Sequence, residues 1–136
     1  SPDRVVEAVK INRITVTQFP TTSNGIGWDV LSTVGADADL TLTVSIGLQE
    51  VWDSPIFYEN CSGQYSYAFT PAVPIRVENL LSDVTVRLYD FDTTSADDYM
   101  TGVQFNFEGY DILRPTSRTV FYDDFEIVLE LDWVFE

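Results

Sequence analysis

Two stretches of this sequence alternate apolar and polar residues, and such alternation is typical of a β-strand that buries one face. In the first stretch, small polar residues or glycine separate five aliphatic residues: Leu40, Leu42, Val44, Ile46 and Leu48. The second stretch covers residues 125–136, and its apolar positions are Phe125, Ile127, Leu129, Leu131, Trp133 and Phe135. An amphipathic helix needs an apolar period of 3.6 residues instead of two. We therefore expect two long strands that face a common core.

Shorter stretches of the same kind suggest further strands. They lie around residues 14–16, 51–58, 65–69, 84–88, 103–107 and 120. Proline, glycine, asparagine and aspartate are concentrated between them, as expected for turns. The pattern predicts an all-β fold, an antiparallel β-sandwich of seven or eight strands without a helix. We expect residues 1–8 to form an N-terminal lead-in and residues 9–136 to form one domain.

The charge and the residue types exclude several functions. The chain has 22 acidic and 7 basic residues, so its formal net charge is −15 and it should repel nucleic acid. It contains no histidine, which excludes the usual zinc sites and histidine-dependent catalytic triads. Cys61 is the only cysteine, so no intramolecular disulfide can form. We expect a binding module and not an enzyme.

Four aspartates lie within nine residues, between the strand expected at 84–88 and the one expected at 103–107. They are Asp90, Asp92, Asp97 and Asp98. Clustered carboxylates repel one another, and a bound Ca²⁺ with six to eight oxygen ligands relieves that repulsion. An EF-hand loop would need Gly and Glu where this chain has Ser95 and Thr101. The loop is therefore either a calcium site of another kind or an acidic turn in solvent.

Residues 86–92, followed by five residues, Asp98 and Gly102, resemble the third loop of the C2 domain family. This resemblance implies a C2-like β-sandwich whose calcium ligands come from two adjacent loops. A first loop would then contribute Asp29 and either Asp37 or Asp39. The choice between Asp37 and Asp39 stays open, because the residue after Asp39 is Leu40 where the family often has proline. The implied metal ligands are Asp29, Asp37, Asp39, Asp90, Asp92 and Asp98.

The resemblance also implies a partner bound in a Ca²⁺-dependent manner, either a protein or a membrane lipid. The loop tip at Thr93 and Thr94 and the single lysine, Lys10, give little support to membrane docking. A carbohydrate-binding or structural accessory domain is the alternative, with calcium structural or absent. Tyr65 and Tyr67 alternate with Phe69, which favours core packing over a sugar-binding face. A calcium site of the weak extracellular type suits a periplasmic, cell-surface or secreted protein.

Overall fold

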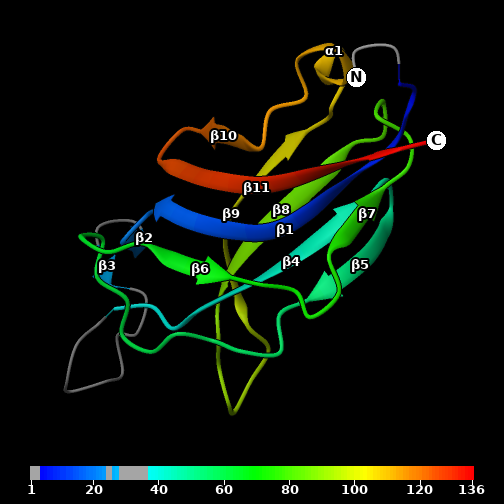
Figure 1. The fold of residues 1–136 in the computed structure, drawn as a ribbon. Coiled ribbons are helices and arrows are strands. Elements are labelled where there is room, and N and C mark those ends of the chain that lie inside the picture. The colour runs from blue at the N-terminus through cyan, green and yellow to red at the C-terminus, as the bar shows by residue number, and fades with distance from the viewer. Residues whose placement is uncertain (1–3, 24–25, 28–36) are drawn as a thin grey trace.

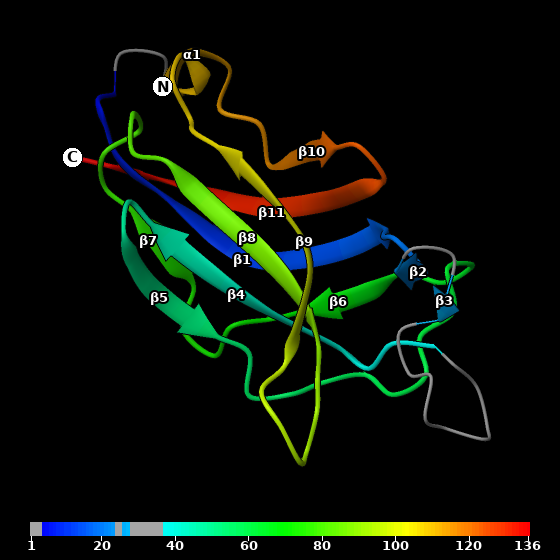
Figure 2. The ribbon, with the colours of Figure 1, turned by 180° about the vertical axis from the view of Figure 1, so that it is seen from behind.

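The computed structural model describes residues 4–23, 26–27 and 37–136, and these form two antiparallel sheets around one core. The first sheet has the order β10 (Ser117–Tyr122), β11 (Phe125–Phe135), β1 (Val6–Gln18) and β6 (Tyr67–Phe69), and β7 (Ile75–Val77) also pairs with β1. The second sheet has the order β5 (Gln49–Asp53), β4 (Leu40–Ile46), β8 (Val84–Asp90) and β9 (Asp98–Phe105). Two short strands, β2 (Thr22–Ser23) and β3 (Ile26–Gly27), pair antiparallel with each other. In Figures 1 and 2 the strands of the second sheet run obliquely across those of the first, which confirms the predicted all-β sandwich.

The two sheets contain nine strands in the described part of the chain, whereas the sequence predicted seven or eight. The added strand is β7, which the sequence pattern did not identify; it pairs with β1 at residues 9–11, next to the pairing of β6 with residues 14–16. Pro71 and Pro74 lie between β6 and β7. Because proline has no N–H to donate to a ladder, these two residues separate β6 from β7.

The two long alternating stretches form β4 and β11, but their surroundings differ. In β11 four of the six predicted core residues are buried, Phe125, Ile127, Leu129 and Leu131, whereas Trp133 and Phe135 are partly exposed. In β4 the residues of the other face are buried too, since Thr41, Thr43 and Ser45 are at most 8% exposed. Loop 54–57 and the Arg87 side chain cover this face, so β4 is not the half-buried strand that was predicted. The prediction also failed at Leu48, which is fully exposed in the turn after Gly47.

One short helix, α1 (Tyr110–Leu113), was not predicted. The residues at its two ends, Gly109 and Arg114, have positive φ angles of 81° and 50°. Four residues are too few to show the apolar period that identifies a helix in sequence. The Tyr110 ring packs edge-on against Phe107, with centroids 6.3 Å apart. Among the described residues no helix has the length and apolar character needed to cross a membrane.

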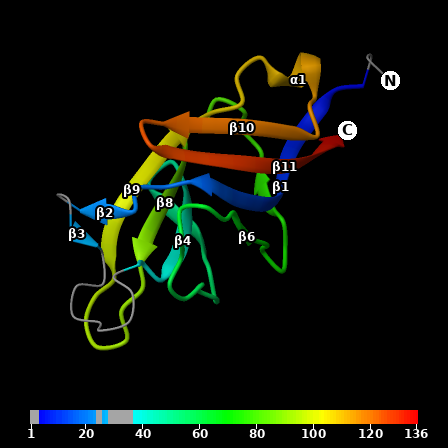
Figure 3. The ribbon, with the colours of Figure 1, turned by 90° about the vertical axis from the view of Figure 1, so that its left-hand side faces the viewer.

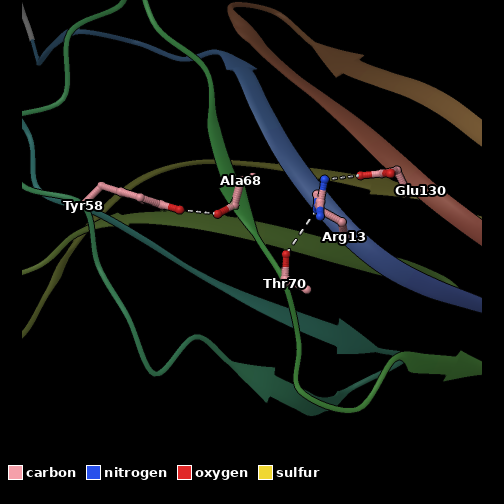
Figure 4. Close-up of polar contacts among 5 residues, drawn as sticks. All are labelled: Arg13, Tyr58, Ala68, Thr70 and Glu130. Carbon is pink, nitrogen blue, oxygen red and sulfur yellow. Dashed lines mark hydrogen bonds and ion pairs between the residues drawn. The ribbon is translucent and has the colours of Figure 1, made fainter.

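Side chains outside the core join the strands of the first sheet to their neighbours (Figure 4). Arg13 on β1 donates a hydrogen bond of 3.2 Å to the Thr70 hydroxyl on one side and pairs at 3.3 Å with Glu130 of β11 on the other. The Tyr58 hydroxyl donates to the Ala68 carbonyl oxygen over 2.5 Å. That bond connects the segment after β5 to β6, and so links the two sheets near the acidic loops.

Candidate functional site

The register of the second sheet brings three aspartates to one end of the sandwich. Asp90, the last residue of β8, pairs with Leu40 at the start of β4 on one side and with Asp98 at the start of β9 on the other. Asp39 immediately precedes Leu40. The loop from β8 to β9 projects at this end, away from α1 (Figures 1 and 3). Opposed like charges such as Asp90 and Asp98 destabilise a strand pair unless something offsets their repulsion.

Asp39 and Asp90 are in direct contact. Asp90 is only 6% exposed, and its Oδ1 accepts a hydrogen bond of 2.9 Å from the Asp39 backbone N–H. In return, the Phe91 N–H donates to the Asp39 carbonyl oxygen over 2.7 Å. The Asp39 Oδ1 accepts the Asn60 N–H at 2.8 Å. Three segments that are far apart in sequence therefore meet at these two aspartates.

Asp37 lies close to the same region but is exposed. Burial raises the pKa of the Cys61 thiol, and the negative charges of Asp39 and Asp37 add to that increase. Cys61 is itself tied to this loop, because its backbone N–H donates to the Ala38 carbonyl oxygen over 2.8 Å. Of the two alternatives left open by the sequence, Asp39 contacts Asp90 through its backbone N–H, while its carboxylate accepts the Asn60 N–H, and which of the two carboxylates holds a metal ion stays a prediction. Asp29 lies outside the described residues.

Asp92 organises the loop between β8 and β9. Its Oδ1 accepts the Thr94 N–H at 3.0 Å and the Thr94 hydroxyl at 3.1 Å, and its Oδ2 accepts the Ser95 hydroxyl at 2.7 Å. These bonds hold the pKa of the Asp92 carboxyl below its ordinary value, the Thr94 N–H contributing most. The Asp92 N–H donates to Asp97 Oδ1 over 2.9 Å. Asp97 thus closes the loop, a role that its spacing did not reveal.

A second loop, residues 54–61, forms part of this end of the molecule, although the sequence pointed to no role for it there. The Phe57 ring stacks on Phe91, with centroids 4.1 Å apart and an interplanar angle of 13°. Leu40 and Tyr58 exchange backbone hydrogen bonds of 2.8 and 2.9 Å. No local pattern could have identified this loop, because these contacts are with residues distant in the chain.

The carboxylates gathered here have the hard oxygen atoms that Ca²⁺ prefers. Within the described ranges, however, no three acidic, histidine or cysteine side chains are arranged to hold a metal ion. The oxygens of Asp39, Asp90 and Asp92 instead accept hydrogen bonds from the loops around them. The ligand chemistry therefore fits calcium, whereas the described side chains form no complete coordination shell.

No protein-family model and no curated protein matches the sequence. Solved structures do match the fold. Human GIVD cytosolic phospholipase A2, in complex with methyl γ-linolenyl fluorophosphonate inhibitor and terbium chloride, is similar over 96% of this chain, with a TM-score of 0.63 and 10% identity. The calcium-bound pair of C2 domains, A and B, of extended-synaptotagmin 2 is similar over 97% of this chain, with a TM-score of 0.59 and 16% identity.

This chain covers 18% of that phospholipase and 47% of that synaptotagmin structure, so it spans less than half the length of either. A longer piece of extended-synaptotagmin 2, which adds the SMP domain to the same two C2 domains, matches over 96% of this chain and 28% of its own length, with a TM-score of 0.57 and 15% identity. At such identities the similarity shows the fold alone. The chain has a C2-like β-sandwich fold.

Proposed function

We propose that this chain is a calcium-binding C2-like module and not an enzyme, and that aspartates from two adjacent loops hold the Ca²⁺. The main support is Asp90, which is buried, pairs with Asp98 in the sheet and accepts a hydrogen bond from the Asp39 backbone N–H. Two of the similar structures point the same way, one being calcium bound and the other containing terbium chloride. The ligands we propose are Asp29, Asp39, Asp90, Asp92 and Asp98, with Asp37 as the alternative to Asp39.

A metal ion at these residues would compete with existing hydrogen bonds. The two oxygens of Asp92 accept bonds from the Thr94 N–H, the Thr94 hydroxyl and the Ser95 hydroxyl, all of which lie in the loop itself and can move with it. Calcium takes six to eight oxygen ligands in flexible geometry at about 2.3–2.6 Å, so modest loop movements can complete its shell. Binding would offset the repulsion between Asp90 and Asp98 and thereby order the loops.

We further propose that the calcium-loaded end contacts a protein or a membrane lipid. Two apolar side chains lie exposed beside it, Ile56 at 48% and Phe57 at 37%, and Phe57 stacks on Phe91 in the acidic loop. Bound Ca²⁺ would lower the negative charge that otherwise repels an anionic partner. Vesicles of neutral and of anionic lipid, each tested with Ca²⁺ and with EDTA, distinguish a lipid partner from a protein partner.

Thermal unfolding in Ca²⁺, Mg²⁺ and EDTA tests the calcium site directly. Calcium at 100 times its dissociation constant should stabilise the wild type by about 2.7 kcal/mol. The double variant Asp90→Asn with Asp92→Asn should lose most of that stabilisation. Magnesium should have less effect at equal concentration, since it needs a stricter octahedral shell.

A matched control removes the same charge at the other end of the sandwich. Glu108→Gln with Asp111→Asn changes two exposed acidic residues at or beside α1 and should leave the calcium response unchanged. A wild type that melts at the same temperature in millimolar Ca²⁺ and in EDTA would rule out the proposed metal site. An equal loss of response in both double variants would indicate general screening of charge instead of specific binding.

A further inference from the structure

A cavity of about 410 Å³ that is wide open to solvent, a shallow hollow in the surface, lies between the edge strands of the two sheets, β9 and β10. It is lined by Phe105, Asn106, Tyr110, Arg118, Val120 and Phe121, among others. Its volume is within the range of roughly 300–1,000 Å³ typical of small-molecule sites. The lining residues of β9 are at the opposite end of that strand from Asp98, so this cavity is separate from the acidic loops.

Arg118 is the charged group of this cavity. Its guanidinium carbon lies 4.0 Å from the centroid of the Tyr110 ring, 5.2 Å from that of Phe107 and 5.3 Å from that of Phe105. Nη1 donates a hydrogen bond of 2.6 Å to the Asn106 carbonyl oxygen. The three rings and this bond hold the side chain in one orientation. An arginine that is already ordered loses little entropy when it binds an anion.

No acidic side chain neutralises Arg118 among the residues that the structure describes. The ion pairs of the described residues are made by Arg13 and Arg76, and none of them includes Arg118. This is unexpected, because the chain has 22 acidic residues and only 7 basic ones, so carboxylates that could pair with an arginine are abundant. Burial lowers the pKa of Arg118, and the electrostatic interaction with Tyr110 raises it in part. Arginine nevertheless keeps its charge at neutral pH.

We propose that this cavity binds a small monocarboxylate with a flat apolar body, whose carboxylate pairs with the Arg118 guanidinium. Arginine presents a planar set of donors that matches a carboxylate in a two-point contact. The Phe121 ring, 71% exposed at the cavity, offers an apolar surface for the rest of the ligand. The net charge of −15 repels a divalent phosphate more strongly than a monovalent carboxylate.

Titration of the ¹⁵N-labelled protein with sodium benzoate, followed by amide chemical shifts, tests this proposal. Saturable shifts should be confined to residues 104–106 and 118–121, with a dissociation constant on the order of millimolar for so small a probe. Benzamide keeps the ring but has no charge, and it should bind at least tenfold more weakly. Inorganic phosphate at the same ionic strength should also bind more weakly.

Variants then assign the binding to Arg118. Arg118→Gln should weaken benzoate binding at least tenfold, whereas Arg13→Gln removes an equal charge from an exposed ion pair on β1 and should leave it unchanged. Should Arg118→Gln fail to fold, Phe121→Ala removes only an exposed ring and should still weaken binding several-fold.

Three results would overturn the proposal. The first is the absence of saturable shifts with benzoate at tens of millimolar. The second is equal binding of benzamide, which would mean that the cavity selects a ring without regard to charge. The third is equal binding of phosphate, which would exclude the monocarboxylate as the preferred class of ligand.

Discussion

At the scale of single residues, the buried hydroxyl groups of β4 differ in whether they have a partner. The Thr41 hydroxyl donates to the Ile56 carbonyl oxygen over 3.2 Å, and the Ser45 hydroxyl accepts a bond of 3.1 Å from Arg87. The Thr43 hydroxyl has no hydrogen-bond partner among the described residues. A buried polar atom without a partner loses its hydration and gains nothing in return. The two threonines should therefore respond oppositely to the same substitution.

Thr43→Val should stabilise the protein by about 1 kcal/mol, because it replaces an unpaired hydroxyl by a methyl group of similar size. Thr41→Val should destabilise it by about 1 kcal/mol, since the Ile56 carbonyl oxygen loses its donor. Urea unfolding curves of the two variants, compared with the wild type, measure both free energies. Equal destabilisation by both substitutions would show that the Thr43 hydroxyl has a partner after all.

Single residues also illustrate what spacing could predict about the candidate site. The pair Asp90 and Asp92, with Asp98 after five residues, was identified from the sequence alone, because loop carboxylates cluster visibly in the chain. Asp37 and Asp39 were alternatives; the structure adds that the Asp39 backbone N–H bonds to Asp90, and the choice of metal ligand between them stays a prediction. The hydrogen bond from the Asn60 backbone N–H to the Asp39 carboxylate had no signal in the sequence, because it forms only when the fold brings two loops together.

At the scale of elements, the segment after β5 departs most from the sequence prediction. A strand was expected over residues 51–58, but β5 is Gln49–Asp53. Pro55 has no N–H for a ladder, and beyond it the chain pairs with β4 again only at Tyr58, which forms an isolated antiparallel bridge with Leu40. Tyr58 anchors this segment through its hydroxyl bond to Ala68 and its backbone bonds to Leu40.

Tyr58→Phe should lower the free energy of unfolding by about 1 kcal/mol, because the Ala68 carbonyl oxygen loses a part-buried donor. Tyr65→Phe is the control, since Tyr65 is 64% exposed and should be nearly neutral. Thermal unfolding of the two variants measures the difference. Similar melting temperatures for both would mean that the hydroxyl of Tyr58 contributes nothing to holding this segment.

At the scale of the whole molecule, the net charge of −15 opposes folding, since it brings like charges close together. Some of this repulsion is local, as at Asp90 and Asp98, and the rest is spread over both sheets. Salt weakens the long-range part, because the Debye length falls from about 30 Å at 0.01 M to about 10 Å at 0.1 M.

Raising NaCl over this range should therefore increase the melting temperature. CaCl₂ at the same ionic strength should raise the melting temperature further, because specific binding at the proposed calcium site adds to screening. Scanning calorimetry in the two salts measures both effects. A melting temperature that falls with NaCl would mean that favourable ion pairs outweigh the repulsion.

The amino-acid sequence by itself determined that the chain forms an all-β sandwich with an acidic loop at one end. Both features are local: alternation with a period of two defines each long strand, and the spacing of Asp90, Asp92 and Asp98 defines the loop. The tertiary structure alone decided that Asp39 meets Asp90, that loop 54–61 joins them, and that Arg118 lies in a cavity between two edge strands. These depend on the register and packing of strands far apart in the chain, which no local pattern encodes.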